Sequence, residues 1–213
     1  MLPVKSFSRA KRRLGDAIGD DERQELAAAM VSDVLAALVP LVDEVIVVTA
    51  EPQAARRAEE SGAAVVHDPE EAGQSAAAAR GIEAALARGA DRVLLVPGDC
   101  PAADPRELEG LLALEGGPPQ VVIVPDRHGT GTNALLLAPP TAVPPSFGAG
   151  SLARHAALAW GAGATVRVRE LPSLGLDVDT PADLAALRAA LSLRAEGASR
   201  TRAVLDRLVH AAA

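Results

Sequence analysis

Short hydrophobic runs alternate along the chain with longer alanine-rich segments whose apolar residues recur at helical spacing. The hydrophobic runs predict strands at residues 1–4, 45–49, 64–66, 92–97, 120–125, 134–138 and 165–170. The helical spacing predicts helices over residues 20–39, 54–61, 74–88, 105–114, 151–160, 181–193 and 199–213. Strands that alternate with helices form right-handed βαβ units, so the pattern indicates an α/β fold with a mainly parallel sheet.

Short polar residues mark several of the expected helix starts. Asp20, Asp104 and Thr180 are expected to act as N-caps. Residues 121–138 contain two strands joined by a short loop, which predicts one antiparallel excursion in the sheet. The length of 213 residues and the lack of an obvious linker favour one large domain.

Composition excludes several classes of protein. The net charge is −7 and the aromatic residues are limited to Phe7, Phe147 and Trp160, so a nucleic-acid or anionic-membrane binder is not expected. Cys100 is the only cysteine, which rules out an intrachain disulfide and fits a reducing cytoplasm. No apolar run reaches the ~18 residues of a membrane span, and the N-terminus lacks a signal peptide's long apolar region. We therefore expect a soluble cytoplasmic protein.

Acidic residues follow two apolar, strand-like runs. Asp99 follows the run 94–98, and Asp177 and Asp179 follow the run 174–176. Ligands of open α/β sheets bind outside the carboxyl ends of the strands, and residues two apart on an extended chain point the same way. Mg²⁺ usually takes one or two carboxylates plus substrate phosphates. The three carboxylates therefore predict a Mg²⁺ site for phosphoryl or nucleotidyl transfer. The alternative is a turn residue and a helix cap.

A basic segment, residues 5–15, follows the first expected strand and therefore lies over the carboxyl edge of the sheet. Lys5, Lys11 and Arg13 could surround a triphosphate there and neutralise charge as pyrophosphate leaves. The alternative is a solvated basic turn.

Three further segments have groups that could hold a polar ligand. Gln74 and Ser75 open a helix and could read a base edge, or Ser75 could serve only as a local cap. The glycine-rich loops 126–133 and 147–151 could offer backbone N–H groups to an anion. For the second loop, a tight turn with Ser151 as N-cap is the alternative. The four histidines show no spacing typical of a zinc site.

Six motifs follow one another along the chain. They are Pro3-Val4-Lys5, Ala10-Lys11-Arg12-Arg13-Leu14, Pro97-Gly98-Asp99-Cys100-Pro101, Gly131-Thr132-Asn133, Phe147-Gly148-Ala149-Gly150-Ser151 and Leu176-Asp177-Val178-Asp179-Thr180-Pro181-Ala182-Asp183-Leu184. Their order and spacing resemble the phosphoenolpyruvate / 2-phospho-L-lactate guanylyltransferase family of coenzyme F420 biosynthesis. The resemblance implies a single-domain Rossmann-like α/β/α sandwich of the nucleotidyltransferase (glycosyltransferase-A) type over residues 1–192. Residues 193–213 would form a C-terminal helical extension.

The resemblance also assigns roles by position. The acid substrate would be held by Thr132, Gly148 and Ser151, the metal by Asp99, Asp177 and Asp179, and the nucleotide phosphates by Lys5, Lys11 and Arg13. One departure from the family pattern is Gly98 with Cys100, where Ala-Asp-Leu-Pro is more usual, but Asp99 itself is in place.

By this resemblance the chain joins GTP to a small phosphorylated three-carbon acid, with Mg²⁺, and releases pyrophosphate. Phosphoenolpyruvate is the expected acceptor, and 2-phospho-L-lactate and 3-phosphoglycerate are alternatives. A non-catalytic GTP-binding regulatory module is a further alternative, since fold does not fix function. Molybdopterin and sugar-phosphate nucleotidyltransferases usually open with a Gly-rich loop, whereas residues 3–14 contain no glycine. The apolar face of residues 199–213 leaves a homodimer contact and docking on its own domain equally open.

Overall fold

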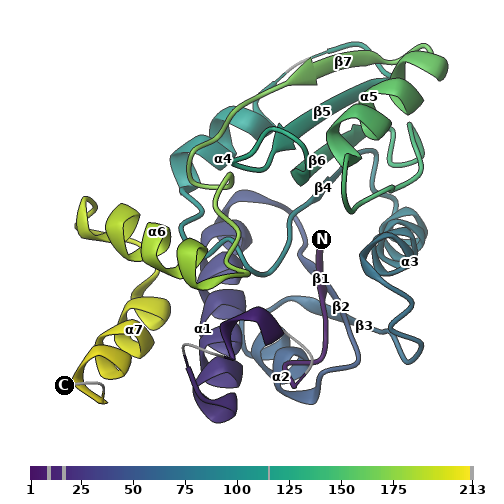
Figure 1. Cartoon of the computed structure of the whole chain (residues 1–213). Helices are drawn as coiled ribbons and strands as arrows, with labels where there is room; N and C mark the ends of the chain where they lie inside the picture. The colour runs from purple at the N-terminus through teal and green to yellow at the C-terminus, as the bar shows by residue number, and fades with distance from the viewer. Residues whose placement is uncertain (9–10, 16–17, 115, 212–213) are drawn as a thin grey trace.

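The computed structural model describes residues 1–8, 11–15, 18–114 and 116–211, in which strands and helices alternate (Figure 1). The strands are β1 Leu2–Val4, β2 Ile46–Thr49, β3 Ala64–His67, β4 Val93–Leu95, β5 Gln120–Pro125, β6 Thr132–Ala138 and β7 Thr165–Val168. The helices are α1 Asp20–Leu38, α2 Pro52–Glu60, α3 Gln74–Ala87, α4 Pro105–Leu112, α5 Ser151–Gly161, α6 Pro181–Ser192 and α7 Ser199–Ala211. Short 3₁₀ turns lie at Arg12–Leu14 and Val39–Leu41. The end of the helix expected over 199–213, residues 212–213, lies outside the described residues.

Two groups of strands meet at β1 and β4. β1, β2 and β3 are parallel neighbours, and the other group has the order β4-β6-β5-β7. β6 is antiparallel to both β4 and β5, whereas β5 and β7 are parallel. Met1 joins the groups, because its amino nitrogen donates to Leu94 O at 2.7 Å and its carbonyl accepts from Val96 N at 3.0 Å. The predicted antiparallel excursion is therefore confirmed, and it is β6.

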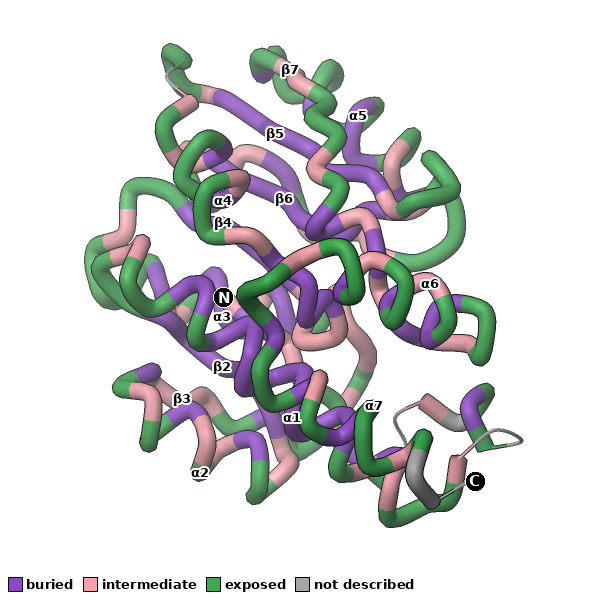
Figure 2. The backbone as a smooth tube through the Cα atoms, turned by 90° about the vertical axis from the view of Figure 1, so that its left-hand side faces the viewer, coloured by how far each residue is buried: buried purple, intermediate pink, exposed green. Residues whose placement is uncertain are grey.

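Alternate residues of the central strands face two separate hydrophobic cores. In β5, Val122 and Val124 pack into the core that also contains residues of α1, α4 and α6. Val121 and Ile123 pack into the core that contains residues of α3 and α5. Almost all of β5 and β6 is buried in consequence (Figure 2). Helices cover both faces of the sheet, which confirms the expected α/β/α sandwich.

Helix α1 is the central helix of the first core. By length and composition alone, the segment Asp20–Leu41 could cross a membrane, although charged residues interrupt its apolar run. In the structure most of this segment is buried inside the protein. Its apolar residues are explained by contact with the sheet and with α7.

The cap of α1 differs from the prediction. Gly19 is the N-cap rather than Asp20, and its backbone N–H donates to Glu22 Oε2 at 2.9 Å. The Asp20 carboxylate instead pairs with Arg23, one turn further along the helix. A side chain inside the first turn can thus make an ion pair where the sequence suggests a cap. The predicted caps of α4 and α6 are confirmed.

Helix α7 docks on α1 of the same chain. The buried Asp33 carboxylate of α1 accepts hydrogen bonds from the backbone N–H groups of Arg200 at 3.2 Å and Thr201 at 2.7 Å. An acidic side chain at the first turn of a helix satisfies its unpaired donors and complements its dipole. Val204 and Leu205 are buried against the first core. The apolar face of α7 is therefore covered by its own domain.

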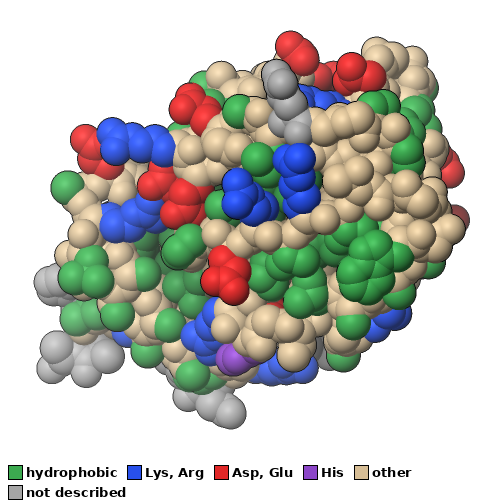
Figure 3. Space-filling view, turned by 90° about the horizontal axis from the view of Figure 1, so that it is seen from above, with side chains coloured by type: hydrophobic (Ala, Val, Ile, Leu, Met, Phe, Trp, Pro, Cys, Tyr) green, Lys and Arg blue, Asp and Glu red, His purple; other side chains and the backbone are tan. Residues whose placement is uncertain are grey.

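The end of the molecule that carries β7 and α5 exposes hydrophobic side chains between charged ones of both signs (Figure 3). Trp160 in α5 is 68% exposed, and Val168 at the end of β7 is 50% exposed. The face in this view carries no continuous basic surface of the kind that nucleic acids require.

Candidate active site

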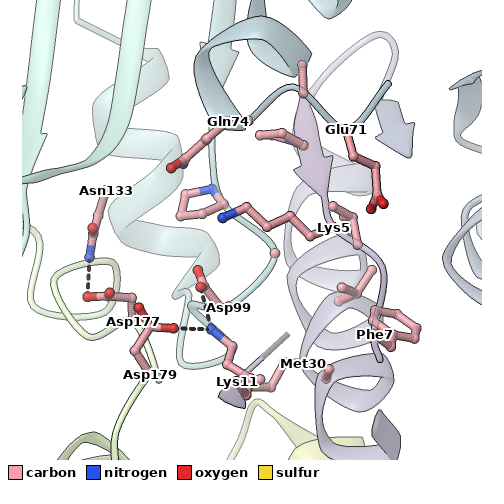
Figure 4. A pocket seen from close by; sticks show the side chains of 18 of the residues that line it. Lys5, Phe7, Lys11, Met30, Glu71, Gln74, Asp99, Asn133, Asp177 and Asp179 are labelled. Atoms are coloured by element: carbon pink, nitrogen blue, oxygen red, sulfur yellow. Dashed lines mark hydrogen bonds and ion pairs between the residues drawn. The ribbon is translucent and has the colours of Figure 1, made fainter. Parts of the chain in front are cut away.

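A cavity of about 470 Å³ lies beyond the carboxyl ends of β1 and β4, next to α1 (Figure 4). This is the edge of the sheet at which α/β proteins bind ligands. Most of the predicted site residues line it, namely Lys5, Lys11, Arg13, Gln74, Asp99, Thr132, Asp177 and Asp179. Ser75, Gly148 and Ser151 are not among the lining residues, and their positions are described below.

Lys11 connects the acidic residues of the cavity. Its Nζ donates to Asp99 Oδ2 at 2.6 Å and to Asp179 Oδ1 at 2.9 Å (Figure 4), and its side chain is only 7% exposed. The backbone of Lys11 has φ 55°, in the left-handed region that residues other than glycine rarely adopt. Burial disfavours the charged form, but the two carboxylates outweigh it and raise the pKa of Lys11 above its usual range. Lys11 is therefore a fixed cation between two carboxylates.

Asp99 follows β4 through a tight turn at Gly98. A Cβ added to Gly98 would lie 3.0 Å from Val31 Cγ2, so this turn passes close to α1 and leaves no room for a side chain. The Oδ1 atom of Asp99 is buried, and none of the described residues donates a hydrogen bond to it. A buried carboxylate oxygen without a donor carries a desolvation cost that a bound cation would offset.

The segment before Asp177 and Asp179 is irregular, so the prediction that they follow a strand was wrong. β7 ends at Val168, and no strand is assigned to residues 169–180. Leu174 and Leu176 are apolar because they fill the first core, not because they pair with a neighbouring strand. A short apolar run of this kind has no periodicity that distinguishes the two cases.

Asn133 holds this irregular segment beside Asp99. Its Nδ2 donates to Leu174 O at 2.9 Å and to Asp177 Oδ1 at 3.1 Å. The backbone N–H of Val178 donates to Asp99 O at 3.1 Å. Asn133 belongs to one of the sequence motifs, but no local pattern predicts its role, because its partners lie more than forty residues away.

The carboxylates of Asp99, Asp177 and Asp179 gather near Lys11 without all facing one point. Over the described ranges of the chain, no three His, Cys, Asp or Glu side chains converge as they would around a metal ion. Asp177 points toward Asn133 (Figure 4). Burial raises the pKa of Asp177, the Asn133 hydrogen bond opposes this rise, and the charge of Asp99 adds to it. The position between Asp99 and Asp179, which Lys11 Nζ occupies, is the place that best suits a cation.

Two glutamates anchor the basic N-terminal segment. The backbone N–H of Ser6 donates to Glu71 Oε1 at 2.8 Å, and that of Phe7 donates to Glu51 Oε2 at 2.9 Å. These contacts direct the Lys5 side chain into the cavity (Figure 4). No local pattern marks either glutamate, since both contacts join the loop to residues more than forty positions away.

Gln74 and Ser75, at the start of α3, have side chains in different surroundings. Gln74 lines the cavity. The Ser75 hydroxyl accepts a hydrogen bond from the backbone N–H of Phe147 at 2.9 Å. Ser75 therefore supports the loop before α5 in this structure.

The loop before α5 contains Gly148 and Gly150, which have φ values of 110° and 71° that favour glycine. Gly150 is the N-cap of α5 and Ser151 is its first residue, so the alternative that made Ser151 the cap was wrong. Arg154 holds the loop from outside, since its Nη2 donates to Ser146 O at 2.9 Å. The same atom donates to the next carbonyl along the loop at 3.2 Å.

His155 connects this loop to Thr132 of β6. Its Nδ1 lies 3.0 Å from Thr132 Oγ1, and its Nε2 accepts from the backbone N–H of Ser146 at 2.9 Å. Burial, followed by the charge of Arg154, lowers the pKa of His155 to about 4. His155 belongs to no spacing typical of a metal site, so the sequence alone assigned it no role. Its position four residues after Ser151, on the same helix face, was the available signal.

Known proteins match the chain over almost its whole length. A family model described as "Guanylyl transferase CofC like" matches residues 1–195. A protein of Conexibacter woesei named phosphoenolpyruvate guanylyltransferase is 50% identical over 216 residues, which cover 98% of this chain and 95% of that protein. A protein of the same name from Sphaerobacter thermophilus is 40% identical over 188 residues, which cover 86% of this chain and 89% of that protein.

Solved structures share the fold at low sequence identity. A nucleotidyl transferase from Methanothermobacter aligns with a TM-score of 0.64 and 21% identity, over 91% of this chain and 98% of that one. Glucosyl-3-phosphoglycerate synthase from Mycobacterium tuberculosis, in complex with Mn²⁺, UDP-glucose and phosphoglyceric acid, aligns with a TM-score of 0.55 and 19% identity, over 98% and 77% of the two chains. The predicted nucleotidyltransferase fold of the glycosyltransferase-A type is confirmed. The chain belongs to the CofC-like family of guanylyl transferases.

Proposed function

We propose that this chain transfers the GMP group of GTP to phosphoenolpyruvate and releases pyrophosphate, a step of coenzyme F420 biosynthesis. The support is the family membership and the name phosphoenolpyruvate guanylyltransferase, which relatives at 40% and 50% identity carry. The observation in the structure that carries the proposal is the cavity in which Lys11 bridges Asp99 and Asp179. Basic and acidic groups held together at this edge of the sheet are what a polyphosphate substrate and a cation require.

The reaction needs positioning and charge neutralisation more than a strong base. A phosphate oxygen of the acid attacks the α-phosphorus of GTP, and the bond from that phosphorus to the bridging oxygen of the β-phosphate breaks. Pyrophosphate leaves with that electron pair. Because the second pKa of a phosphate monoester is about 6, the attacking oxygen is already ionised near neutral pH. The contribution of the protein is to align the two phosphates and to neutralise the negative charge around them.

The basic side of the cavity would bind the phosphates of GTP. Lys5 and Arg13 line the cavity, and Lys5 points into it (Figure 4). Their charges would stabilise the departing pyrophosphate, with Lys11 contributing a buried positive charge beside the carboxylates. Gln74, at the start of α3, would contact the guanine base, with Ser75 next to it.

The acidic residues fit a Mg²⁺ ion. We assign Asp99 and Asp179 to it, because the buried Asp99 Oδ1 has no donor among the described residues. Asp177, whose Oδ1 accepts from Asn133 here, is the third predicted ligand. The ammonium of Lys11 also marks a point within 2.9 Å of oxygens of both Asp99 and Asp179. A bound Mg²⁺ would supply charge neutralisation and a template for the phosphates. Such an ion would compete with the Lys11 ammonium for the two carboxylates.

The side of the cavity formed by β6 and α5 would hold the acid. Thr132 lines the cavity, Gly148 lies in the loop before α5, and Ser151 is the first residue of α5. Ser151 is at the first turn of α5, where the positive end of the helix dipole favours a carboxylate or phosphate.

The proposal includes the extent of the enzyme and its location. Residues 1–192 would form the nucleotidyltransferase domain and residues 193–213 a helical extension. The cytoplasm would be its compartment. A homodimer remains a prediction, to be tested by the mass of the protein in solution, although the apolar face of the extension packs on α1 of its own chain.

Pyrophosphate release from the purified chain tests the proposal. The reaction contains GTP and Mg²⁺ with phosphoenolpyruvate, 2-phospho-L-lactate, 3-phosphoglycerate or no acceptor. We expect release with phosphoenolpyruvate and background release without an acceptor. Release with one of the other acids alone would contradict the choice of acceptor. Binding of GTP without release for any acid would contradict the transferase and favour the regulatory module.

A further inference from the structure

His155 is a buried histidine whose protonation site can be assigned from its partners. It is 0% exposed, and both ring nitrogens have a hydrogen-bond partner. The backbone N–H of Ser146 donates to Nε2 at 2.9 Å. A backbone N–H can only donate, so Nε2 carries a lone pair. The single proton of the neutral ring therefore lies on Nδ1.

The proton on Nδ1 determines the direction of the Thr132 hydroxyl. Nδ1 lies 3.0 Å from Thr132 Oγ1, so the ring N–H donates and the hydroxyl oxygen accepts. This bond does not use the proton of the hydroxyl. Since Thr132 lines the cavity, the hydroxyl can donate that proton to an anionic ligand bound there.

The same ring supports the loop 146–151. The Phe147 ring meets the His155 ring edge-on, with centroids 5.2 Å apart and planes at 73°. Phe147 is in turn held to α3 by its backbone N–H, which donates to the Ser75 hydroxyl. One imidazole thus fixes both β6 and the loop, the two elements that carry Thr132, Gly148 and Ser151.

We propose that His155 is a positioning residue for the phosphorylated acid, which points the Thr132 hydroxyl proton into the cavity and holds the loop 146–151 beside it. This inference rests on the proposed function, because the acid is the ligand that these elements would bind. Burial and the neighbouring Arg154 lower the pKa of His155 to about 4, which keeps the ring neutral and the proton on Nδ1 near neutral pH. His155 itself does not line the cavity.

Two substitutions test the hydrogen bonds of Nδ1 and Nε2 separately. His155→Asn places an amide near the position of Nδ1 and can still donate to Thr132, whereas His155→Gln places an amide near Nε2 and can still accept from Ser146. Steady-state rates of pyrophosphate release, with GTP and phosphoenolpyruvate varied in turn, give the two KM values separately. We expect His155→Gln to raise the KM for phosphoenolpyruvate about tenfold and His155→Asn about threefold. The KM for GTP should change by less than about twofold in both.

Double variants show whether His155 acts through Thr132. The double variant His155→Gln/Thr132→Val should have a KM for phosphoenolpyruvate no higher than that of the more affected single variant. Both substitutions remove the same hydroxyl contact. The matched control combines Arg154→Gln with Thr132→Val. Arg154 holds the loop without contacting Thr132. The rises in the KM for phosphoenolpyruvate caused by the two substitutions should therefore multiply. Equal rises in the KM for GTP and the KM for phosphoenolpyruvate in His155→Gln would overturn the proposal. So would rises in the KM for phosphoenolpyruvate that multiply when His155→Gln is combined with Thr132→Val.

A spectrum of the wild-type chain tests the same idea without a variant that could misfold. With ¹⁵N-labelled histidine, long-range ¹H–¹⁵N spectra should show one neutral ring protonated on Nδ1 from about pH 6 to pH 8. Its Nδ1 signal should shift when phosphoenolpyruvate is added and stay unchanged with GTP alone. A ring assigned to His155 by its loss in His155→Gln, but protonated on Nε2 or on both nitrogens, would overturn the proposal. A wild-type chain that releases no pyrophosphate with any acid would contradict the proposed function instead.

Discussion

The two sides of the cavity are built from different interactions. On the side of the N-terminal loop, opposite charges organise the site, with the Lys11 ammonium held between Asp99 and Asp179. On the side of β6 and α5, neutral hydrogen bonds do so, through Thr132 and His155. The first side depends on buried charge, and the second on the direction of individual protons.

This difference implies a division of tasks. Coulomb attraction varies slowly with distance and angle, so the charged side can stabilise a triphosphate and a leaving pyrophosphate as they move. Hydrogen bonds weaken steeply when misaligned, so the neutral side can distinguish one small acid from another. We therefore expect variants of the charged side to lower kcat and variants of the neutral side to raise the KM for the acid.

Asp99→Asn should have the largest effect. It removes a charge that pairs with Lys11 and, in the proposed function, binds Mg²⁺. Removing several kcal/mol of transition-state stabilisation should lower kcat about a thousandfold. The melting temperature should stay within a few degrees of wild type, and the exposed Asp91→Asn is the matched control. Activity close to wild type would contradict the role of Asp99.

Lys11→Met should have the next largest effect, and it should move two measurements in opposite directions. Loss of the buried cation should lower kcat about a hundredfold. The same change removes the ammonium that competes for Asp99 and Asp179, so Mn²⁺, measured by electron paramagnetic resonance in place of Mg²⁺, should bind more tightly. Weaker Mn²⁺ binding would mean that Lys11 assembles the carboxylates instead of competing for them.

Ser75→Ala tests which side of the cavity Ser75 belongs to. In the structure its hydroxyl accepts from Phe147 N, so its loss should loosen the loop before α5. We expect the KM for phosphoenolpyruvate to rise about threefold while the KM for GTP is unchanged. A rise confined to the KM for GTP would instead support the prediction from sequence that Ser75 contacts the nucleotide.

Asp183→Ala should have little effect on kcat but should lower stability. Burial disfavours the Asp183 charge, but hydrogen bonds from Thr180 and Asp179 N and the charge of Arg127 outweigh it, so the pKa lies below its ordinary value of 3.8. The carboxylate then stabilises the fold above that value, and this contribution disappears as the pH falls through the folded pKa. Loss of the Asp183 half of the capping box should cost about 1 kcal/mol near neutral pH.

Urea unfolding at several pH values measures this contribution. The difference in unfolding free energy between wild type and Asp183→Ala should be constant from neutral pH down to about pH 5 and should shrink below pH 4. A difference that grows on acidification would contradict the lowered pKa.

The sequence predicted the layers of the fold because each strand and helix has its own local pattern. β6 was found from two adjacent hydrophobic runs, and the caps of α4 and α6 from Asp104 and Thr180. The prediction failed where an apolar run had a different cause. Leu174 and Leu176 look like a strand but are core residues of an irregular segment.

The motifs predicted which residues belong to the site. They did not predict which hydrogen bonds and ion pairs these residues form with one another. Lys11 was assigned to the nucleotide phosphates, and nothing local indicates that it reaches Asp99 and Asp179, 88 and 168 residues away. Asn133 was left without a role for the same reason, whereas His155 was left without one because its spacing matches no metal site. The direction of a proton depends on a backbone N–H brought in by the tertiary fold, such as that of Ser146.

The fate of a label in the α-phosphate of GTP tests the central claim most directly. The purified chain is incubated with Mg²⁺, phosphoenolpyruvate and GTP labelled at the α-phosphorus, and the products are separated. The account predicts that the label appears in a conjugate of GMP and phosphoenolpyruvate and that the pyrophosphate is unlabelled. Label recovered as free GMP or as unchanged GTP would contradict the transfer.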